Sequence, residues 1–415
     1  MSSDAQVTAQ VIGQYEALPY PPRDPADEAK RLITGSPSFL PELNHYVFGG
    51  RRDFSKPFRA LVAGGGTGDG TIQLAALLAQ TPGAHEVVYL DLSAAARGIA
   101  ESRAKARGLT NIRFLTGSLL DIATLALGPY DYIEACGVLH HLDDPAAGLQ
   151  ALSAQLAEGG GLGLMLYGIH GRVGVYPMQA ALRQLIPHDI PIPEQVMLAK
   201  KLLADLPASN ALLRNPVVGD HKASDAGLFD LLLHARDRAY SVMQIGFLLE
   251  RAGLAASAWI EPCRYDPDSY IKDEELRARA AQLSPLERAA LAERISSTLK
   301  VHAFYAVPKA RLSEAVARPA PDLIPYLHEL PPAALATTLD KRGELAINFP
   351  AERLVFKTPP RVNGVGAPEI VARMDGRRSL GQIAAEMQIG WDDFLPLYLP
   401  VHKLLTGINK LFLRG

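Results

Sequence analysis

The chain has 415 residues, 48% of them hydrophobic and 21% charged, with a formal net charge of −2 at pH 7. This composition is typical of a globular protein with a large core, and the small charge argues against bulk nucleic acid or an anionic membrane as a partner. Its two cysteines are far apart and lack CxxC spacing, which argues against a disulfide framework and a thiolate zinc site. Without a secretory signal or an apolar run of about 18 residues, the chain is expected to be cytoplasmic.

The first 58 residues are expected to form an N-terminal helical cap. A short helical pattern is followed by "YEALPYPPRDP", whose prolines hold the chain extended before another helix that begins near Asp24. This segment places Tyr15 and Tyr20 just ahead of the first strong strand pattern.

From residue 59 to about residue 309, strand and helix patterns alternate. The strand patterns are nearly all apolar, as in a sheet buried on both faces, and the alternation predicts parallel strands with covering helices. Helical patterns with prolines at about 171–238 interrupt the alternation and are expected to be an insertion. The expected strands lie within 58–64, 85–92, 111–121, 130–142, 161–168, 255–262 and 300–308.

The rest of the chain predicts a small separate domain. A proline-rich stretch at 310–345 is expected to be a linker. Residues 346–415 carry helical patterns in "MDGRRSLGQIAAEM" and "LPLYLPVHKLL" and a strand pattern in "INKLFLRG", an order that resembles a winged helix. The cations of this domain are few and scattered, which disfavours DNA binding.

The glycine-rich stretch "RALVAGGGTGDG" follows the first strand pattern. Glycines let the backbone turn sharply and approach a ligand, and the helix that follows points its N-terminus at the same place. A triphosphate-binding loop would need lysine where this chain has Asp69. A dinucleotide-binding loop would need glycine or alanine at the same position.

Asp91 ends the second strand pattern, beside the glycine turn at the carboxyl edge of the predicted sheet. A carboxylate there can accept charge-assisted hydrogen bonds from both hydroxyls of a ribose. The alternative is that Asp91 only caps the next helix. Together with the turn, it indicates an adenosine-containing cofactor without saying which one.

Five stretches in order resemble the motifs of class I S-adenosylmethionine-dependent methyltransferases: "ALVAGGGTGDG", "VVYLDLS", "IRFLTGSLLD", "YDYIEACGVLHHLDDP" and "LAEGGGLGLMLYG". The resemblance covers residues 59–168 and extends to about residue 309 by strand order. It implies an α/β, Rossmann-like, mostly parallel sheet of seven strands with a reversed last strand, for which "KVHAFYAVP" is the candidate. It also implies S-adenosylmethionine as cofactor and S-adenosylhomocysteine as product.

Two departures from the family concern the cofactor contacts. The family often has an acid two positions before the first glycine, where this chain has Val62, and an aspartate in its third motif, where this chain has Ser118. Adenine would then be held by Ser118, the N–H of Leu119 and packing from Leu92, with Asp121 as a second acid. The expected cofactor-binding residues are Tyr15, Tyr20, Gly64, Gly65, Gly66, Thr67, Gly68, Asp91, Leu92, Ser118, Leu119 and Gly137.

The candidate catalytic residues are Tyr20, His140 and His141. Methyl transfer from a sulfonium mainly needs alignment of donor and acceptor, so a general base is optional. One of the two histidines could act as a general base. The alternative is that both histidines only shape the loop. Tyr15 and Tyr20 lie on a segment that resembles tyrosine–proline segments folding over the cofactor in some bacterial methyltransferases, where a ring facing the sulfonium gains cation–π energy. The alternative is packing against the sheet edge.

Two further stretches are candidates to face the acceptor. "YGIHGRVGVYPMQ" mixes polar and aromatic residues among glycines, as in a lid. "HKASDAGLFDLLLHARDRAYSV" carries acids that suit a cationic acceptor such as lysine, with a salt-bridged helix surface as the alternative. Its spacing is not diagnostic of a metal, so no metal site is expected. The expected substrate-binding residues are Tyr167, Arg172, Tyr176, His234 and Tyr240.

The leading interpretation is a methyltransferase that acts on a protein side-chain nitrogen, with lysine favoured. Bacterial protein lysine methyltransferases with appended domains support that preference. A small-molecule methyltransferase stays open, as do a cofactor-sensing DNA-binding regulator and a nicotinamide-dependent oxidoreductase. The acceptor is the expected partner, nucleic acid and membrane are not expected, and a homodimer stays open.

Overall fold

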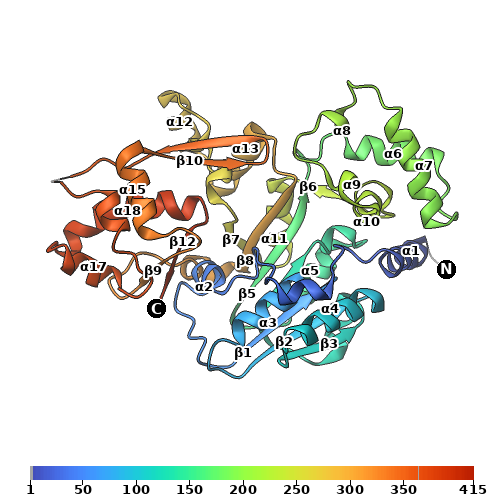
Figure 1. The fold of residues 1–415 in the computed structure, drawn as a ribbon, viewed down its shortest axis with the longest axis horizontal. Helices are drawn as coiled ribbons and strands as arrows, with labels where there is room; N and C mark the ends of the chain where they lie inside the picture. Colours follow the sequence, from blue (N-terminus) through green and yellow to red (C-terminus); the bar gives the residue numbers. More distant parts are fainter. Residues whose placement is uncertain (1–2, 363) are drawn as a thin grey trace.

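The structure, a computed structural model, describes residues 3–362 and 364–415 (Figure 1). A mostly parallel sheet forms its centre, with strand order β3-β2-β1-β4-β5-β8-β7 and a short strand, β6, paired to β5. β8 runs antiparallel to both β5 and β7, so the last strand is reversed. The strands are β1 (Phe58–Ala63), β2 (His85–Asp91), β3 (Ile112–Thr116), β4 (Tyr130–Cys136), β5 (Leu156–Gly168), β6 (Ala239–Tyr240), β7 (Leu254–Trp259) and β8 (Val301–Pro308).

Apolar side chains cover both faces of this sheet. On one face Val62 and Tyr132 belong to a buried cluster with helices α2 and α3, and on the other Leu61 and Ile133 join helices α5 and α11. Neighbouring residues of a strand point to opposite faces, which explains why β1 and β4 are apolar almost throughout. The helices that cover the sheet are α2 (Leu40–Val47), α3 (Asp69–Leu78), α4 (Ala94–Ala106), α5 (Pro145–Ser153) and α11 (Val242–Arg251). Two more helices follow β7, α12 (Glu274–Ala280) and α13 (Pro285–Ser296), and α13 packs on α11.

The N-terminal segment is held against α3 and α4 by ion pairs, of which the one between Arg103 and Glu28 is buried on both sides. It contains α1 (Ser3–Ala17) and the 3-10 helix η1 (Pro25–Ala29). Arg103 of α4 pairs with Glu28 and with Asp69, each at 2.7 Å, and Arg23 pairs with Asp69 as well. Removing one member of a buried pair leaves an uncompensated charge and costs about 3–5 kcal/mol, so these contacts fix the segment strongly.

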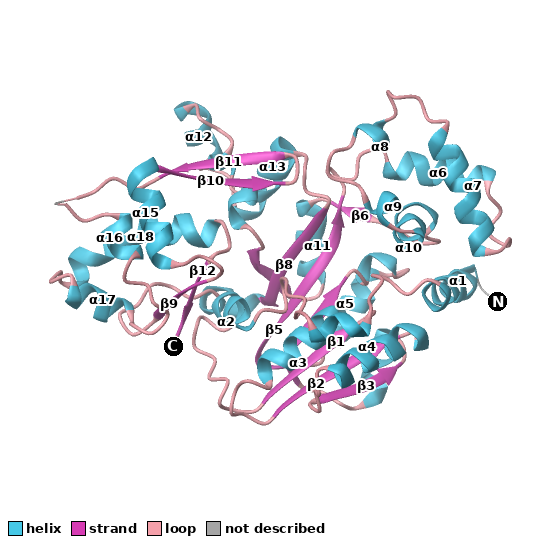
Figure 2. Ribbon diagram, in the orientation of Figure 1, coloured by secondary structure: helices cyan, strands magenta, loops and turns pink. Residues whose placement is uncertain are grey.

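The helical insertion follows β5 and has a core of its own. Leu182, Val196 and Leu232 are buried in it, and Leu18 of the N-terminal segment packs against it. Figure 2 shows these helices beside α1, beyond the end of β5 at which β6 lies. The insertion contains α6 (Val175–Leu185), α7 (Ile192–Ala204), α8 (Ala211–Arg214), α9 (Asp220–Ala223), α10 (Asp225–Leu228) and a π-helical turn (Phe229–Leu233).

The C-terminal part is joined to α2 by buried hydrogen bonds. Asn409 Nδ2 donates to Glu42 Oε2 at 2.8 Å, and the Leu413 N–H donates to His45 Nδ1 at 2.9 Å. β12 pairs with β9, so the segment 310–345 supplies a strand to this part. Its elements are α14 (Leu312–Ala315), β9 (Ile324–Leu327), α15 (Pro332–Arg342), β10 (Glu344–Phe349), β11 (Glu352–Lys357), α16 (Ala367–Val371), α17 (Leu380–Glu386), α18 (Trp391–Gly407) and β12 (Leu411–Arg414). The winged-helix resemblance stays a prediction.

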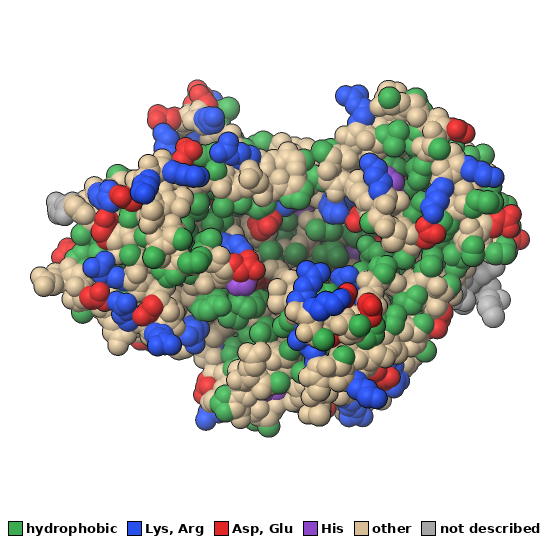
Figure 3. Space-filling model, viewed as in Figure 1, with side chains coloured by type: hydrophobic (Ala, Val, Ile, Leu, Met, Phe, Trp, Pro, Cys, Tyr) green, Lys and Arg blue, Asp and Glu red, His purple; other side chains and the backbone are tan. Residues whose placement is uncertain are grey.

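The predicted fold class is confirmed: the sheet has the expected seven-strand path, the reversed last strand and the helical insertion. Figure 3 shows the surface hollowed between the C-terminal part and the insertion. Across residues 3–362 and 364–415, no helix combines the length and apolar character needed to cross a lipid bilayer.

Candidate cofactor and acceptor site

The turn after β1 has a backbone that only glycine tolerates at several points. Gly64, Gly66 and Gly68 have φ of +74°, +52° and +100°. A Cβ on Gly64 would lie 2.2 Å from Val138 Cγ2, and a Cβ on Gly65 would lie 2.3 Å from the Tyr89 ring. The glycines therefore serve two needs, a left-handed backbone and close packing against β2 and the loop after β4.

We expect Gly64→Ala to lower the free energy of unfolding by about 2–5 kcal/mol. The left-handed backbone costs an alanine about 1–2 kcal/mol, and the overlap with Val138 adds about 1–3 kcal/mol. Gly108 is the matched control, because it has φ of +67° and nothing within 4 Å of an added Cβ. Denaturant unfolding should give Gly108→Ala the backbone cost alone, and equal losses in the two variants would contradict the packing argument.

Asp91 lies at the carboxyl end of β2, beside the turn. Its Oδ2 accepts the Gly66 N–H and its Oδ1 accepts the Ser93 N–H, both at 2.8 Å. Burial raises the pKa of this carboxyl, while the two N–H donors oppose that rise. Each carboxylate oxygen can accept a second hydrogen bond, so both hydroxyls of a ribose can still be held here.

The residues expected around adenine lie at the end of β3, next to Asp91. Ser118 caps the following 3-10 helix η2 (Leu119–Leu125), because its hydroxyl accepts the Leu120 N–H at 3.1 Å. Leu119 is buried, whereas Leu92 is 37% exposed and so offers an apolar surface to a ring. The apolar surface at this edge of the sheet is suited to a purine ring. The Ser118 hydroxyl already accepts the Leu120 N–H, so its predicted contact with adenine stays a prediction.

The proline-stiffened segment lies directly on the glycine turn. Thr67 Oγ1 donates to the Pro21 carbonyl at 2.7 Å, and Ser93 Oγ donates to the Tyr15 carbonyl at 3.3 Å. A Cβ on Gly66 would come within 3.2 Å of the Tyr20 carbonyl oxygen. Burial raises the pKa of the Tyr20 hydroxyl to about 12, so this hydroxyl stays protonated at neutral pH.

A buried carboxylate, Asp230, lies among the residues that the sequence predicts to face the acceptor. Its Oδ1 accepts the Tyr15 hydroxyl at 3.1 Å and its Oδ2 accepts the Tyr167 hydroxyl at 3.0 Å. Asp230 comes from the π-helical turn of the insertion, Tyr15 from α1 and Tyr167 from β5. Burial raises the pKa of Asp230, and the two tyrosine hydrogen bonds offset part of that rise.

Two stacked histidines complete this group, which we call the Asp230 cluster: Asp230, Tyr15, Tyr167, His141 and His234. The rings of His141 and His234 lie 3.9 Å apart. His141 Nδ1 donates to the Arg236 carbonyl at 2.7 Å, so a neutral His141 has a free lone pair on Nε2, 3.5 Å from the Tyr15 hydroxyl. His234 Nδ1 instead accepts the Arg236 N–H at 3.0 Å, which places the proton of its neutral ring on Nε2.

The Asp230 cluster fits a metal ion poorly. His141, Asp230 and His234 each offer one ligand atom, and these atoms lie within 4.8 Å of one another. A metal-bound histidine normally donates its second ring N–H to an acceptor. His141 does so, but the second nitrogen of His234 accepts a backbone N–H, so His234 can offer a lone pair to a metal only as an imidazolate. The arrangement suits proton transfer and hydrogen bonding better.

Tyr167 is held between two planar groups. The His140 ring stacks on it at 3.9 Å, and the Arg172 guanidinium lies 3.7 Å from its centroid, which places the two groups on opposite faces. Arg172 also pairs with Asp237 at 2.9 Å. His140 is fully buried, and burial lowers its pKa well below the usual range, so a neutral His140 orients Tyr167.

The remaining expected substrate residues divide between two places. Tyr176 lies beside the Arg172 guanidinium, 5.8 Å from ring centroid to carbon. Tyr240 instead packs against the apolar core under α5 and α11, and Arg238 lies near its hydroxyl. The structure thus brings Tyr167, His234 and Tyr15 into one cluster and leaves Tyr240 outside it.

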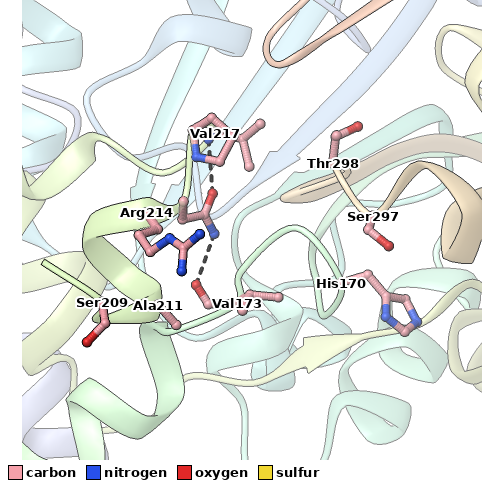
Figure 4. A pocket seen from close by; sticks show the side chains of 10 residues that line it. His170, Val173, Ser209, Ala211, Arg214, Val217, Ser297 and Thr298 are labelled. Carbon is pink, nitrogen blue, oxygen red and sulfur yellow. Dashed lines mark hydrogen bonds between the residues drawn. The ribbon is translucent and has the colours of Figure 1, made fainter.

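A shallow groove of about 330 Å³ lies where the loop after β5 meets the end of α8 and the turn after α13 (Figure 4). His170 and Val173 line it from the loop that carries Arg172, Arg214 lines it from the end of α8, and Ser297 and Thr298 line it from the turn after α13. None of the residues that line the groove belongs to the Asp230 cluster.

Sequence reasoning did not select Asp230 as a site residue. The signal was a carboxylate inside the apolar run "LFDLLL", since a lone acid among buried leucines needs partners. Its partners Tyr15 and Tyr167 lie 215 and 63 residues away in sequence, so no local pattern could have paired them.

Comparisons with known proteins agree with this geometry. A methyltransferase-domain family model matches residues 61–162. The uncharacterized protein syc1184_c from Synechococcus sp. is 30% identical over 304 residues, which are 72% of this chain and 71% of that protein. PKMT2 from Rickettsia typhi has a similar fold, with a TM-score of 0.63 and 14% identity over 92% of this chain and 76% of that one. The same protein in complex with AdoHcy gives a TM-score of 0.61 at 15% identity, over 96% of this chain and 77% of that one.

The sheet order, the glycine turn and the family match define a class I S-adenosylmethionine-dependent methyltransferase domain. The chain is thus an enzyme that uses S-adenosylmethionine, and it belongs to the same family as syc1184_c. The predicted enzyme class and cofactor are confirmed.

Proposed function

We propose that this methyltransferase acts on an amine nitrogen, and that its acceptor is the side chain of a lysine in a protein. The observation that carries the proposal is Asp230, a buried carboxylate held by two tyrosine hydroxyls at the carboxyl edge of the sheet. Within residues 3–362 and 364–415, no lysine or arginine forms an ion pair with it at 4 Å or less. A buried carboxylate without a cation suits an ammonium group brought by a substrate.

The residues of the Asp230 cluster have separate tasks in this proposal. Asp230 attracts the lysine ammonium, and the hydroxyl oxygens of Tyr15 and Tyr167 accept its N–H groups. His141 Nε2 takes one proton, because its lone pair is free and its other nitrogen is fixed to the Arg236 carbonyl. A lone pair is then exposed on the acceptor nitrogen.

The cofactor, held by Asp91 and the glycine turn, supplies an activated methyl group on a sulfonium. The nitrogen lone pair forms the new N–C bond while the C–S electron pair leaves with sulfur. The protein contributes chiefly alignment, which can lower a barrier by about 7–11 kcal/mol. The N-terminal segment over the turn excludes water from this path.

Two features support a protein acceptor over a small molecule. The structure is similar in fold to PKMT2 of Rickettsia typhi, a protein lysine methyltransferase. The surface is also hollowed between the C-terminal part and the insertion, which leaves room for an acceptor chain (Figure 3). We propose that residues 1–58 cap the cofactor and that the C-terminal domain, winged-helix-like in its order of elements, helps to select the substrate.

Methyl-labelled S-adenosylmethionine tests the proposal directly. The purified enzyme is incubated with a cell lysate, and proteins and metabolites are separated. We expect label in protein, released as methylated lysine after acid hydrolysis, and no label with the Asp91→Ala variant. Label confined to the metabolite fraction would contradict the protein acceptor.

A further inference from the structure

Glu134 is a second buried carboxylate, and it has no role in the proposed methyl transfer. It lies on β4, is only 4% exposed, and accepts the Ser38 hydroxyl at 2.5 Å. The Cys136 thiol also donates to it, and burial raises the pKa of Glu134 to about 7. Such a group is costly to bury and calls for a partner.

The strand register places Glu134 beside Val62. The two residues are direct neighbours in the parallel pair β1–β4, so their side chains point to the same face of the sheet. Val62 is the position at which the first motif of this methyltransferase class often carries an acid. The carboxylate missing from β1 is therefore present one strand away.

The backbone around Glu134 is adapted to it. A Cβ on Gly70, in the first turn of α3, would lie 2.1 Å from Glu134 Oε1. The need for this space explains why the last residue of the "GGGTGDG" stretch is a glycine: a side chain there would collide with the Glu134 carboxylate.

Two other buried acids of the molecule have an arginine or a histidine as partner. Glu28 is paired with Arg103, and Glu293 bonds His302 and the Val242 N–H. In residues 3–362 and 364–415, Glu134 has neutral donors and no ion pair with a lysine, arginine or histidine at 4 Å or less. An external cation would complete its environment.

We propose that Glu134 binds the α-ammonium group of the methionine part of S-adenosylmethionine, in place of an acid on β1. The order of the strands gives the reason. The purine edge lies at β3 and the ribose acid at β2, so a cofactor that continues along the edge crosses β1 and brings its amino-acid end to β4. At that end of the cofactor, Glu134 lies on β4 and Gly137 lies in the loop that follows β4.

The test compares two ligands on the Glu134→Gln enzyme by calorimetry. S-Adenosylhomocysteine carries the α-amino group, and its deaminated analogue has hydrogen in that place. A charge-assisted hydrogen bond contributes about 10- to 100-fold in affinity, so the variant should bind S-adenosylhomocysteine that much more weakly and bind the analogue within about twofold of the wild type.

Glu42→Gln is the matched control. Glu42 is also a buried acid that accepts neutral donors, Ser36, Tyr305 and Asn409, but it lies on α2 away from the cofactor edge. It should leave the ratio of the two affinities unchanged. Equal weakening of both ligands by Glu134→Gln, or no weakening of either, would overturn the proposal. If Glu134→Gln does not fold, Glu134→Asp gives the same test, because the shorter carboxylate should lose affinity for S-adenosylhomocysteine alone.

Discussion

Replacing Asp91 by alanine is expected to weaken the binding of S-adenosylhomocysteine by about 100- to 10,000-fold. The carboxylate can accept both ribose hydroxyls, and each hydrogen bond to a charged group contributes about 1.5–3 kcal/mol. The variant also releases the Gly66 and Ser93 N–H groups that shape the turn, which adds to the loss. Calorimetric titration measures the change directly.

Asp121 supplies the control for this experiment. It is an exposed acid in the 3-10 helix after β3, one strand further along the same edge. Asp121→Ala should weaken the binding of S-adenosylhomocysteine by at most about tenfold, the value of one exposed hydrogen bond to adenine. A loss as large as that of Asp91→Ala would mean that the ribose is held at the end of β3, and the assignment of Asp91 would be wrong.

The cofactor half of the site could be predicted from sequence because its information is local. Strand β1, the glycine turn and α3 are consecutive, and Asp91 is the last residue of the next strand along the chain. In a parallel sheet, consecutive strands present their carboxyl ends at one edge, so these residues meet without knowledge of distant contacts. The family motifs cover the same stretch, residues 59–168.

The acceptor half could be predicted only in part. The sequence singled out His141, Tyr15, Tyr167 and His234 one by one, but their shared partner Asp230 depends on how the insertion folds back over β5. The role of Glu134 likewise depends on strand register, since only the pairing with Val62 shows that one acid stands where another is missing. These contacts join residues that are distant in sequence, and hydrophobic periodicity does not predict such contacts.

Tyr240 shows the limit of reasoning from sequence proximity. It is close in sequence to His234 and was predicted to bind the same substrate, but β6 pairs with the end of β5 and the half-buried Tyr240 ring packs against the core, outside the Asp230 cluster. The hydrophobic gain of burying an aromatic ring outweighs any tendency of neighbouring residues to share a site.

The second large effect is expected on turnover rather than on cofactor binding. Asp230→Asn should lower kcat by about 100- to 10,000-fold, because it removes the charge that holds the acceptor ammonium near His141. His141→Gln should cause a loss of the same order, since glutamine can hydrogen-bond but cannot take the proton. The measurement is the initial rate of label transfer into lysate protein.

The affinity for S-adenosylhomocysteine distinguishes a loss of catalysis from a loss of folded protein in these variants. Both variants should bind it within about threefold of the wild type, because neither residue lies on the edge of the sheet that is predicted to hold adenine and ribose. His188→Gln is the matched control, an exposed histidine of the same insertion, and it should keep full activity. If Asp230→Asn and His141→Gln transferred methyl groups at the wild-type rate, the amine-binding role of the cluster would be excluded.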